Sequence, residues 1–409
     1  MRIEIDTVKG FQDFLPKEAL KREKVKSIIT KWFKLYGFLP LETPIIEFDN
    51  LMSSENEGDE SISDRFRLKD RGNRDLGLRY EFTFQLARIL KQNPNLKFPF
   101  KRYQIGEVFR DEPVSSTRFR QFTQCDADII GDSTVNADAE ILALFSDILK
   151  ELKIKNEIQI NNRKLLNAII ESVEMSETEK VMREIDKIDK IGIDMVKANL
   201  RRYASTNQIV TFFKILEKDL KFFKENAFPG FEEVEKLVKL CKQYGIKIKF
   251  NPFLARGLAY YTGNIFEFKV PGQRDTIAGG GRYDKTVGKY SARDIPATGA
   301  SFGLERVTQL AEIKVPKLPK VLILSISQDE KAISLAKELR KNKISCALLS
   351  GKPTKALEYA NSQEIGYVVF IGEEEVEKNK FKFKEMSTGE EILVNEKQLI
   401  GKLKEKNNS

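Results

Sequence analysis

The sequence predicts an α+β protein with an antiparallel sheet, a helical insertion within the sheet region, and a small α/β domain at the C-terminal end. A strand-like run before residue 110 and another after residue 118 have the pattern of a long-looped antiparallel pair. Residues 163–245 are rich in Lys and Glu and contain no proline before Pro229, which is typical of helices. From Lys320 onward, strand and helix patterns alternate, as expected of an α/β domain. At 409 residues the chain is too long for one compact core, so two or three domains are expected.

The composition is that of an ordinary globular protein, with 41% hydrophobic and 32% charged residues. No apolar run approaches the roughly 20 residues of a membrane span, and the first residues lack a signal-peptide pattern. The three cysteines are far apart and form no CxxC pair, which favours reduced thiols over a disulfide framework or a zinc site. We therefore expect a cytoplasmic protein. The net charge of +9 favours a polyanionic partner.

The chain contains no histidine. This count excludes histidine-based acid–base catalysis, Ser-His-Asp triads and imidazole metal ligands. Any reaction must therefore depend on carboxylates, arginines, tyrosines and backbone groups, with magnesium brought by a substrate.

The N-terminal part has the pattern of a helix followed by short strands. Apolar residues at helical spacing predict a helix over residues 17–36, and residues 38–48 read as a strand broken by prolines. The polar residues 53–77 predict a loop with a short hairpin. A strand then leads into a helix near Thr83, and Glu81 and Thr83 stand at that junction. Helix capping is the simpler role for Thr83.

The stretch from residue 102 to residue 131 carries most of the charged residues that suggest chemistry. Residues 103–110 fit a strand, residues 111–117 are turn-prone, and a second strand-like run ends at Gly131. Arginines flank the loop and carboxylates lie at the far end, which indicates a polyphosphate clamp beside a hydrogen-bonding pocket. An ordinary exposed hairpin with solvated charges is the alternative. The second run carries Arg118, Arg120, Thr123, Gln124, Asp126 and Asp128.

Three later segments add candidate residues, after a predicted helix at residues 137–152 and a strand near 157–160. Residues 253–268 (FLARGLAYYTGNIFEF) predict a strand preceded by Arg256, with Ala259 and Tyr261 on one face. A core strand with buried tyrosines is the alternative. Three successive glycines in IAGGGRYD indicate close approach of a ligand or another strand. In IPATGASFGLERV a strand of small residues runs into a helix.

These segments together resemble one enzyme family. RYQIGEVFRDEPVSSTRFRQFTQCDADIIG resembles motif 2 of the class II aminoacyl-tRNA synthetases, in the version found in histidyl-tRNA synthetases. Residues 17–48 are similar to motif 1 and IPATGASFGLERV to motif 3, where the small residues from Gly299 to Gly303 would leave flat space for adenine. LRYEFT, RGLAYYTG and IAGGGRYD resemble the segments that surround histidine in that family. Ala259 departs from the aspartate of most bacterial members, which removes a carboxylate near the pocket.

The resemblance covers nearly the whole chain and implies a domain organisation. It implies a catalytic core at residues 1–162, a helical insertion at 163–245, the rest of the core at 246–315, and an anticodon-binding-like domain at 320–409. The last range has nearly balanced charge, with 16 Lys and Arg against 14 Asp and Glu, so its assignment depends on position and resemblance. No GxxxxGK[ST] or GxGxxG follows a strand, so neither a P-loop nor a Rossmann nucleotide site is indicated.

The resemblance implies a histidine–tRNA ligase that forms histidyl-adenylate from L-histidine and ATP and passes it to tRNA(His). It implies Mg²⁺ bound with ATP, no metal held by the protein itself, and a homodimer formed through motif 1. Arg110 and Arg256 are the implied catalytic residues, both acting on the α-phosphate. The implied ATP-binding residues are Arg110, Glu112, Arg118 and Arg306. The implied histidine-binding residues are Glu81, Thr83, Gln124, Asp128, Arg256, Tyr260 and Tyr261.

Three other interpretations remain open. The first is a histidine-binding regulatory subunit of ATP phosphoribosyltransferase, but such paralogues typically lack the C-terminal domain and the ATP-binding arginines. The second is a class II synthetase for another amino acid, which RGLAYYTG and GGGRYD disfavour. The third is an RNA-binding protein without catalysis, which the retained arginines disfavour.

Overall fold

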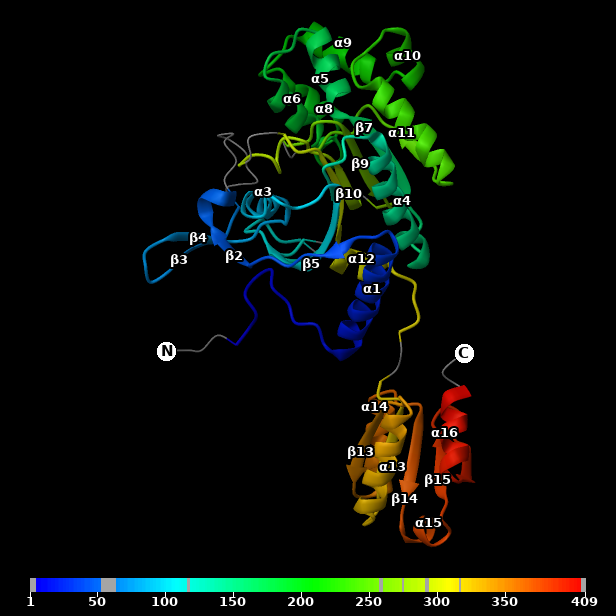
Figure 1. Ribbon diagram of the computed structural model, residues 1–409. Coiled ribbons are helices and arrows are strands. Elements are labelled where there is room, and N and C mark those ends of the chain that lie inside the picture. The colour runs from blue at the N-terminus through cyan, green and yellow to red at the C-terminus, as the bar shows by residue number, and fades with distance from the viewer. Residues whose placement is uncertain are drawn as a thin grey trace. The chain divides into compact units, whose positions relative to one another are not determined.

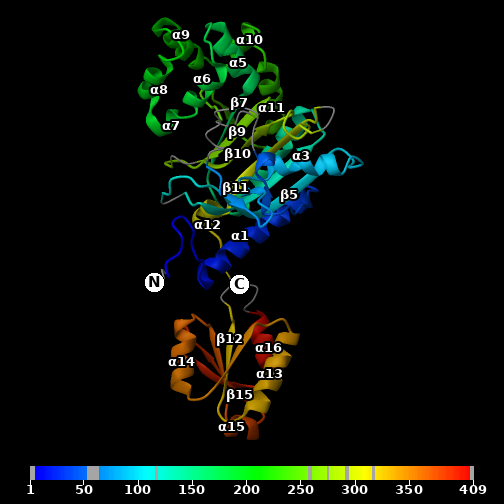
Figure 2. The ribbon, with the colours of Figure 1, turned by 90° about the vertical axis from the view of Figure 1, so that its left-hand side faces the viewer.

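The computed structural model describes residues 5–52, 64–115, 118–256, 260–273, 276–290, 294–315 and 318–405. The chain divides into two compact units, Met1–Ile313 and Lys314–Ser409. Figures 1 and 2 label their helices and strands. Among the residues in the ranges above, no helix is both long enough and apolar enough to cross a membrane.

The first unit mixes helices with two sheets. Its helices are α1 (Pro16–Leu35), η1 (Asp49–Met52), α3 (Thr83–Gln92), α4 (Val135–Glu151), α5 (Arg163–Ser172), α6 (Thr178–Ile185), α7 (Ile188–Ile191), α8 (Ile193–Leu200), α9 (Thr206–Leu216), α10 (Leu220–Glu225), α11 (Phe231–Gln243) and α12 (Leu304–Leu310). Its strands are β1 (Leu39–Pro40), β2 (Ile46–Phe48), β3 (Arg67–Lys69), β4 (Asp75–Leu78), β5 (Phe100–Phe109), β6 (Gln121–Ile130), β7 (Glu157–Asn162), β8 (Ile248–Phe250), β9 (Asn264–Lys269), β10 (Thr276–Arg282) and β11 (Ala297–Gly303).

An eight-stranded sheet organises this unit, in the order β1-β5-β6-β11-β10-β9-β7-β8. The inner pairs are antiparallel, and the short strands β1 and β8 join the two edges in parallel. The predicted long-looped antiparallel pair is present as β5 and β6, with ten residues on each strand. Gly131 ends β6 with φ +89°, and the ring of Phe98 fills the space that a side chain would need there. A smaller sheet has the order β2-β4-β3.

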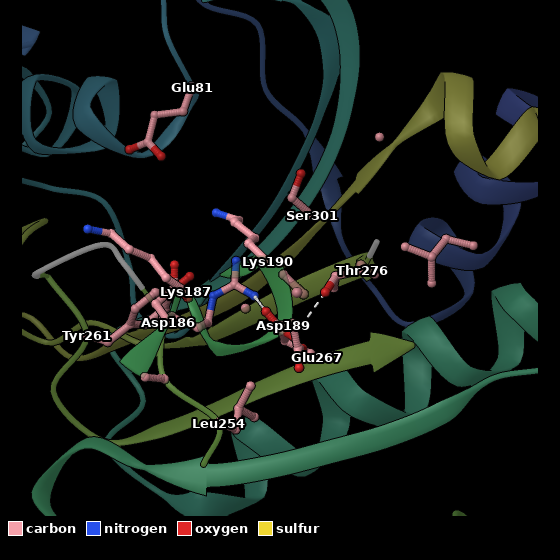
Figure 3. A pocket seen from close by; sticks show the side chains of 18 of the residues that line it. Glu81, Asp186, Lys187, Asp189, Lys190, Leu254, Tyr261, Glu267, Thr276 and Ser301 are labelled. Carbon is pink, nitrogen blue, oxygen red and sulfur yellow. Dashed lines mark hydrogen bonds and ion pairs between the residues drawn. The ribbon is translucent and has the colours of Figure 1, made fainter. Parts of the chain in front are cut away.

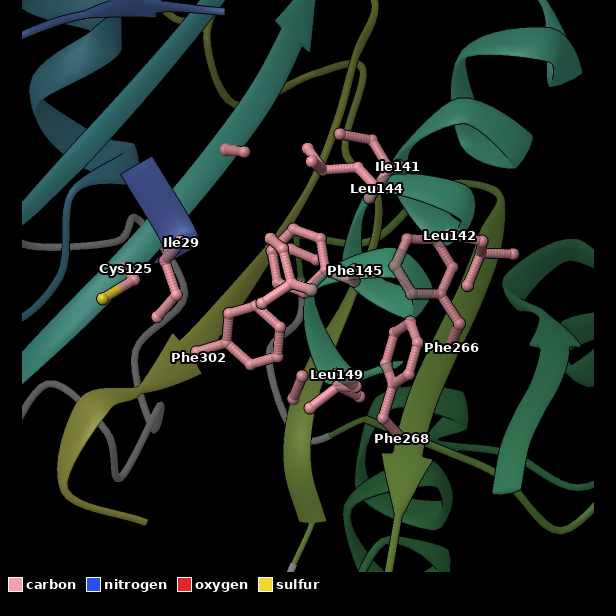
Figure 4. Packing of buried hydrophobic residues seen from close by; sticks show 14 of the residues in the cluster. Ile29, Cys125, Ile141, Leu142, Leu144, Phe145, Leu149, Phe266, Phe268 and Phe302 are labelled. Atoms are coloured by element: carbon pink, nitrogen blue, oxygen red, sulfur yellow. The ribbon is translucent and has the colours of Figure 1, made fainter. Parts of the chain in front are cut away.

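One face of the large sheet is apolar and packs on helices. Cys125, Ala127 and Ile129 of β6 and the phenylalanines of β9 and β11 point to this face, where α1, α4, α11 and α12 contribute their own apolar residues. Phe145 of α4 lies at the centre, with its ring 4.3 Å from that of Phe302 and stacked on it (Figure 4). Because side chains alternate along a strand, the opposite face of β6 is left for polar residues.

Replacing Phe145 with alanine is expected to destabilise the first unit by about 3–5 kcal/mol, since the surrounding rings cannot fill the cavity. Urea unfolding followed by fluorescence of Trp32 is the measurement, because this tryptophan is the only one in the chain and packs against the same core. As a control, Val210→Ala at an exposed site on α9 should change stability by less than about 0.5 kcal/mol. Equal effects of the two variants would contradict this description of the core.

The helices α5–α11 follow β7 and form the upper part of the unit in Figure 1. Three of them start with side-chain caps: Asn162 accepts from the backbone N–H of Lys164, Asp219 accepts from the backbone N–H of Phe222, and Ser205 and Gln208 form a reciprocal capping box. Their apolar faces form a second core with Leu86 of α3 and other residues from the far side of the sheet.

The second unit is a five-stranded α/β sheet in the order β13-β12-β14-β15-β16. The β12–β13 and β12–β14 pairs are parallel, and the last two strands are antiparallel. The strand, helix and terminal-helix pattern predicted from Lys320 is confirmed. The elements are β12 (Val321–Ser325), α13 (Asp329–Lys341), β13 (Cys346–Ser350), α14 (Pro353–Ser362), β14 (Tyr367–Ile371), α15 (Glu373–Glu377), β15 (Phe381–Glu385), β16 (Glu391–Val394) and α16 (Glu396–Glu405).

One secondary-structure prediction is wrong. Tyr260 and Tyr261 do not lie on a strand, because the strand begins only at Asn264 and the two tyrosines belong to the turn before it. The predicted loop at residues 53–63 and the position of Ala259 lie outside the described residues. The predicted hairpin that follows that loop is present as β3 and β4.

Candidate active site

A cavity of about 1170 Å³ lies on the polar face of the large sheet. Its floor comes from β6, β9, β10 and β11, and the loops before α3 and after β5 form one wall. All eleven candidate residues line this single cavity: Glu81, Thr83, Arg110, Glu112, Arg118, Gln124, Asp128, Arg256, Tyr260, Tyr261 and Arg306. Segments separated by more than 200 residues in the chain therefore meet at one cavity.

Arg110, at the end of β5, is held flat between aromatic rings. Its guanidinium carbon lies 4.3 Å from the centre of the Tyr80 ring and 5.1 Å from that of Phe122, and Nε donates to the backbone oxygen of Tyr80. Tyr80 in turn donates its hydroxyl to Glu112 at 3.0 Å. These contacts fix the plane of the guanidinium, which is the group suited to grip a phosphate with two parallel hydrogen bonds.

Arg256 lies against strands β9 and β10. Its Nη1 is 3.1 Å from Oε1 of Glu267, whose Oε2 accepts a hydrogen bond from Thr276 at 2.9 Å. Burial raises the pKa of Glu267, and the charge of Arg256 opposes that rise. The guanidinium lies over Gly279, where any side chain would overlap it. Gly279 of β10 thus leaves open the space that the guanidinium of Arg256 occupies.

Arg306 and Arg118 occupy two more positions on the wall of the cavity. Arg306, in the first turn of α12, donates from Nη1 to the backbone oxygen of Thr276. Arg118 is exposed and follows the turn after β5, where its backbone pairs with Ser115. Together with Arg110, Arg256 and Arg183 of α6, these residues make five arginines that line one cavity.

Glu81 is a buried carboxylate at the start of α3. The hydroxyl of Tyr260 donates to its Oε2 at 3.4 Å, and Thr83 also bonds to the carboxylate. Burial raises the pKa of Glu81 to about 7, and the charge of Arg110 opposes that rise. A buried carboxylate beside two hydroxyls is a suitable partner for a ligand ammonium group.

Asp128, on β6, is a second buried carboxylate of the cavity. Its Oδ2 is 2.7 Å from Nη2 of Arg102, and its Oδ1 accepts the hydroxyl of Tyr283. Burial raises the pKa of Asp128, while the charge of Arg102 and the hydrogen bond from Tyr283 oppose this. A side chain at Gly299 on the neighbouring strand would overlap the carboxylate. The small residue there makes room for Asp128.

A hydrogen-bonded chain connects β6 to β11. Gln124 donates to the hydroxyl of Ser301 at 3.0 Å, and that hydroxyl donates to Asp126. Burial raises the pKa of Asp126 to about 7. The small residues expected to leave flat space for adenine all line the cavity: Gly299, Ala300, Ser301 and Gly303.

The helical insertion supplies the side of the cavity opposite Glu81. Figure 3 shows Asp186, Lys187, Asp189 and Lys190 near Glu267 and Tyr261. Asp189 pairs with Lys269 of β9, and Lys187 pairs with Glu184 at 2.8 Å. The insertion therefore closes one wall of the cavity.

Three residues of the site were missed from sequence alone: Arg102, Glu267 and Tyr283. Tyr283 lies in the GGGRYD segment and lines the cavity. The neighbouring side chain, Arg282, instead pairs with Asp138 beneath the sheet. Glu267 alternates with Phe266 and Phe268 along β9, so its position on the polar face follows from the strand period. Arg102 requires the β5–β6 register, which the sequence does not give.

The fold and the site define the class of protein. An antiparallel sheet with a polar cavity surrounded by arginines, followed by a separate α/β unit, is the arrangement expected of a class II aminoacyl-tRNA synthetase. The comparisons with known proteins agree. The histidyl-tRNA synthetase family profile matches residues 10–307, and an anticodon binding domain profile matches residues 320–406.

The chain belongs to the histidyl-tRNA synthetase family. It is 38% identical to histidine–tRNA ligase 1 of Bacillus cereus, over 96% of this chain and 98% of that one, and 32% identical to histidine–tRNA ligase of Helicobacter pylori, over 94% of each. The crystal structure of histidyl-tRNA synthetase from Nostoc sp. superposes with a TM-score of 0.86 at 27% identity, covering 99% of this chain and all of that one.

Proposed function

We propose that this protein ligates L-histidine to tRNA(His) in two steps, through histidyl-adenylate. The observation that supports this most directly is the convergence of Arg110 and Arg256 with the buried carboxylates Glu81 and Asp128 in one cavity. The arginines suit the phosphates of ATP, and the carboxylates suit an amino acid that carries an ammonium group and a polar ring.

In the first step, a carboxylate oxygen of histidine attacks the α-phosphorus of ATP. The new O–P bond forms as the bond to pyrophosphate breaks, so the products are histidyl-adenylate and pyrophosphate. Charge builds up on the non-bridging oxygens, and catalysis needs positioning and cations more than proton transfer. This requirement is compatible with a chain that lacks histidine.

In this proposal, different arginines bind different phosphates of ATP. Arg110 and Arg256 hold the α-phosphate from opposite sides, and Arg118 and Arg306 hold the β- and γ-phosphates. Glu112 contacts the adenine amino group. Mg²⁺ enters with ATP, because in nucleotide sites much of its coordination comes from substrate phosphates and water.

The amino acid occupies the deeper part of the cavity. Glu81 and Thr83 hold its ammonium group, and Gln124 with Arg256 holds its carboxylate. Asp128 and Tyr261 meet the two ring nitrogens, and Tyr260 packs beside them, with its ring centre 4.7 Å from that of Tyr261. A pocket that hydrogen-bonds a polar ring rejects apolar analogues strongly, since its own buried groups would be left unpaired.

In the second step, the 3′-terminal ribose hydroxyl of the tRNA attacks the adenylate carbonyl, AMP leaves, and the second unit binds the anticodon. We further propose a homodimer in the cytoplasm. The apolar side chains of Leu39, Ile46 and Phe48, which follow α1 in the chain, are exposed and would be covered in a dimer.

ATP–pyrophosphate exchange measured with each of the twenty amino acids tests this function. We expect exchange with histidine alone, and histidine acceptance by tRNA(His) in a second assay. The second candidate, a histidine-binding regulatory subunit of ATP phosphoribosyltransferase, predicts histidine binding without exchange. It is less supported, because the arginines are retained and the anticodon-binding profile also matches.

The KM for histidine is expected to rise as pH falls from 8 to 6. Glu81, with a pKa of about 7, becomes protonated over this range and no longer attracts the ammonium group. The ring of free histidine also becomes protonated, so Glu81→Gln is the control that isolates the carboxylate. The increase in the unaltered protein should be about tenfold larger than in Glu81→Gln. Equal pH dependence in the two proteins would exclude Glu81 as the ammonium partner.

A further inference from the structure

Arg102 is the largest side chain that is fully buried in the described part of the chain, with an exposed fraction of 0%. It lies on β5, directly opposite Asp128 on β6, and both point to the polar face of the sheet. Asp128 lines the cavity, whereas Arg102 does not. Arg102 can therefore influence a ligand only through its neighbours.

A buried guanidinium is costly unless an opposite charge accompanies it. Asp128 supplies that charge, with Oδ2 at 2.7 Å from Nη2 of Arg102. The charge of Arg102 also acts on Asp126, which is on the same face two residues earlier. The contact is an ion pair rather than an aligned hydrogen bond, since the guanidinium nitrogens have no hydrogen-bond acceptor among the described residues.

We propose that Arg102 is a positioning residue that determines specificity: its charge keeps Asp128 a carboxylate, so that the pocket takes the neutral ring of histidine without taking up a proton. The proposal depends on the proposed function, in which Asp128 meets the imidazole.

The hydrogen-bond arrangement supports this assignment. With Asp128 ionised, the hydroxyl of Tyr283 donates its hydrogen to Oδ1, as the structure has it, and only acceptor lone pairs remain on these oxygens for a ligand. A neutral imidazole carries one N–H donor, which suits such acceptors. If Asp128 were protonated, it would present a donor instead and compete with the ring for acceptors.

The groups around Asp128 leave Arg102 as its closest cation. Asp126 on the same strand and Glu81 before α3 are both acidic, and Tyr283 after β10 is neutral. Loss of the Arg102 charge would leave three buried carboxylates together. The ring of histidine, which is neutral in solution between pH 7 and pH 9, would then bind as imidazolium beside these carboxylates, so binding to the variant takes up a proton that binding to the unaltered protein does not need.

The test compares Arg102→Gln, which removes the charge but keeps a hydrogen-bond donor, with Arg102→Lys, which keeps the charge. The measured quantity is a ratio: the KM of the variant for histidine in ATP–pyrophosphate exchange, divided by the KM of the unaltered protein at the same pH. For Arg102→Gln this ratio should rise at least about tenfold between pH 7 and pH 9, because binding must take up a proton that becomes scarcer. For Arg102→Lys the ratio should stay constant within about threefold.

The KM for ATP should change less than about threefold in both variants, since Arg102 does not line the cavity. A ratio for Arg102→Gln that is independent of pH, an equal rise for Arg102→Lys, or a matching rise in the KM for ATP would overturn the proposal. Arg102→Met gives the same prediction as Arg102→Gln if the latter does not fold. Absence of histidine-dependent exchange in the unaltered protein would instead contradict the proposed function.

Discussion

Asp128→Ala is expected to reduce kcat/KM for histidine activation by about 10⁴-fold or more, while the protein remains folded. The carboxylate is a buried acceptor that lines the cavity, and the ring of the amino acid has no other charged partner there in our proposal. The change also leaves Arg102 buried without its closest counter-charge. The variant should therefore lose both its affinity for histidine and its discrimination between histidine and other amino acids.

Histidine-dependent pyrophosphate exchange is the measurement for this variant, with circular dichroism to confirm folding. Asp75→Ala is a matched control, because Asp75 is an exposed aspartate of β4 in the same unit and pairs with an exposed lysine. Its exchange rate should be unchanged within about twofold. A folded Asp128→Ala variant that retains exchange would exclude Asp128 from histidine recognition.

Arg256→Ala is expected to lower kcat for adenylate formation by about 10²–10³-fold, the range for removal of one group that stabilises transition-state charge. Glu267 and the backbone at Gly279 fix the guanidinium before any substrate arrives, so little reorganisation is needed during the reaction. Because the interaction strengthens as charge develops on the α-phosphate, kcat should fall much more than the KM for either substrate rises.

Single-turnover measurement of adenylate formation separates this effect from product release. Arg74→Ala is the control, because Arg74 is an exposed arginine paired with Asp70 on the β3–β4 hairpin. The control should keep the rate of the unaltered protein. If Arg256→Ala raised only the KM and kept kcat, Arg256 would contribute to ground-state binding alone.

The elements with strong periodicity could be predicted from sequence. The β5–β6 pair and α4 follow from side-chain alternation and helical spacing, and all eleven candidate residues meet in one cavity. The order of the family motifs along the chain predicted that these residues lie close together. The spacing of residues within any one segment could not, because no local pattern indicates that Glu81 and Arg256 are neighbours.

Other features depend on tertiary structure and could not be predicted. The strand expected at Tyr260 begins later, because the aromatic residues favoured in strands are here used to pack on one another in a turn. The partnership of Arg102 with Asp128 needs the register of two strands, and a shift by one residue would place Arg102 in the apolar core. The placement of the insertion residues near Glu267 requires the packing of helices far along the chain.

A crystal structure with a non-hydrolysable analogue of histidyl-adenylate shows whether histidine and the α-phosphate of ATP bind in this cavity as proposed. We predict that the imidazole lies within hydrogen-bond distance, about 3 Å, of Asp128, and that the group replacing the α-phosphate lies between Arg110 and Arg256 at similar distances. An analogue bound outside this cavity, or one whose phosphate mimic contacts neither arginine, would contradict the proposed roles of Asp128, Arg110 and Arg256.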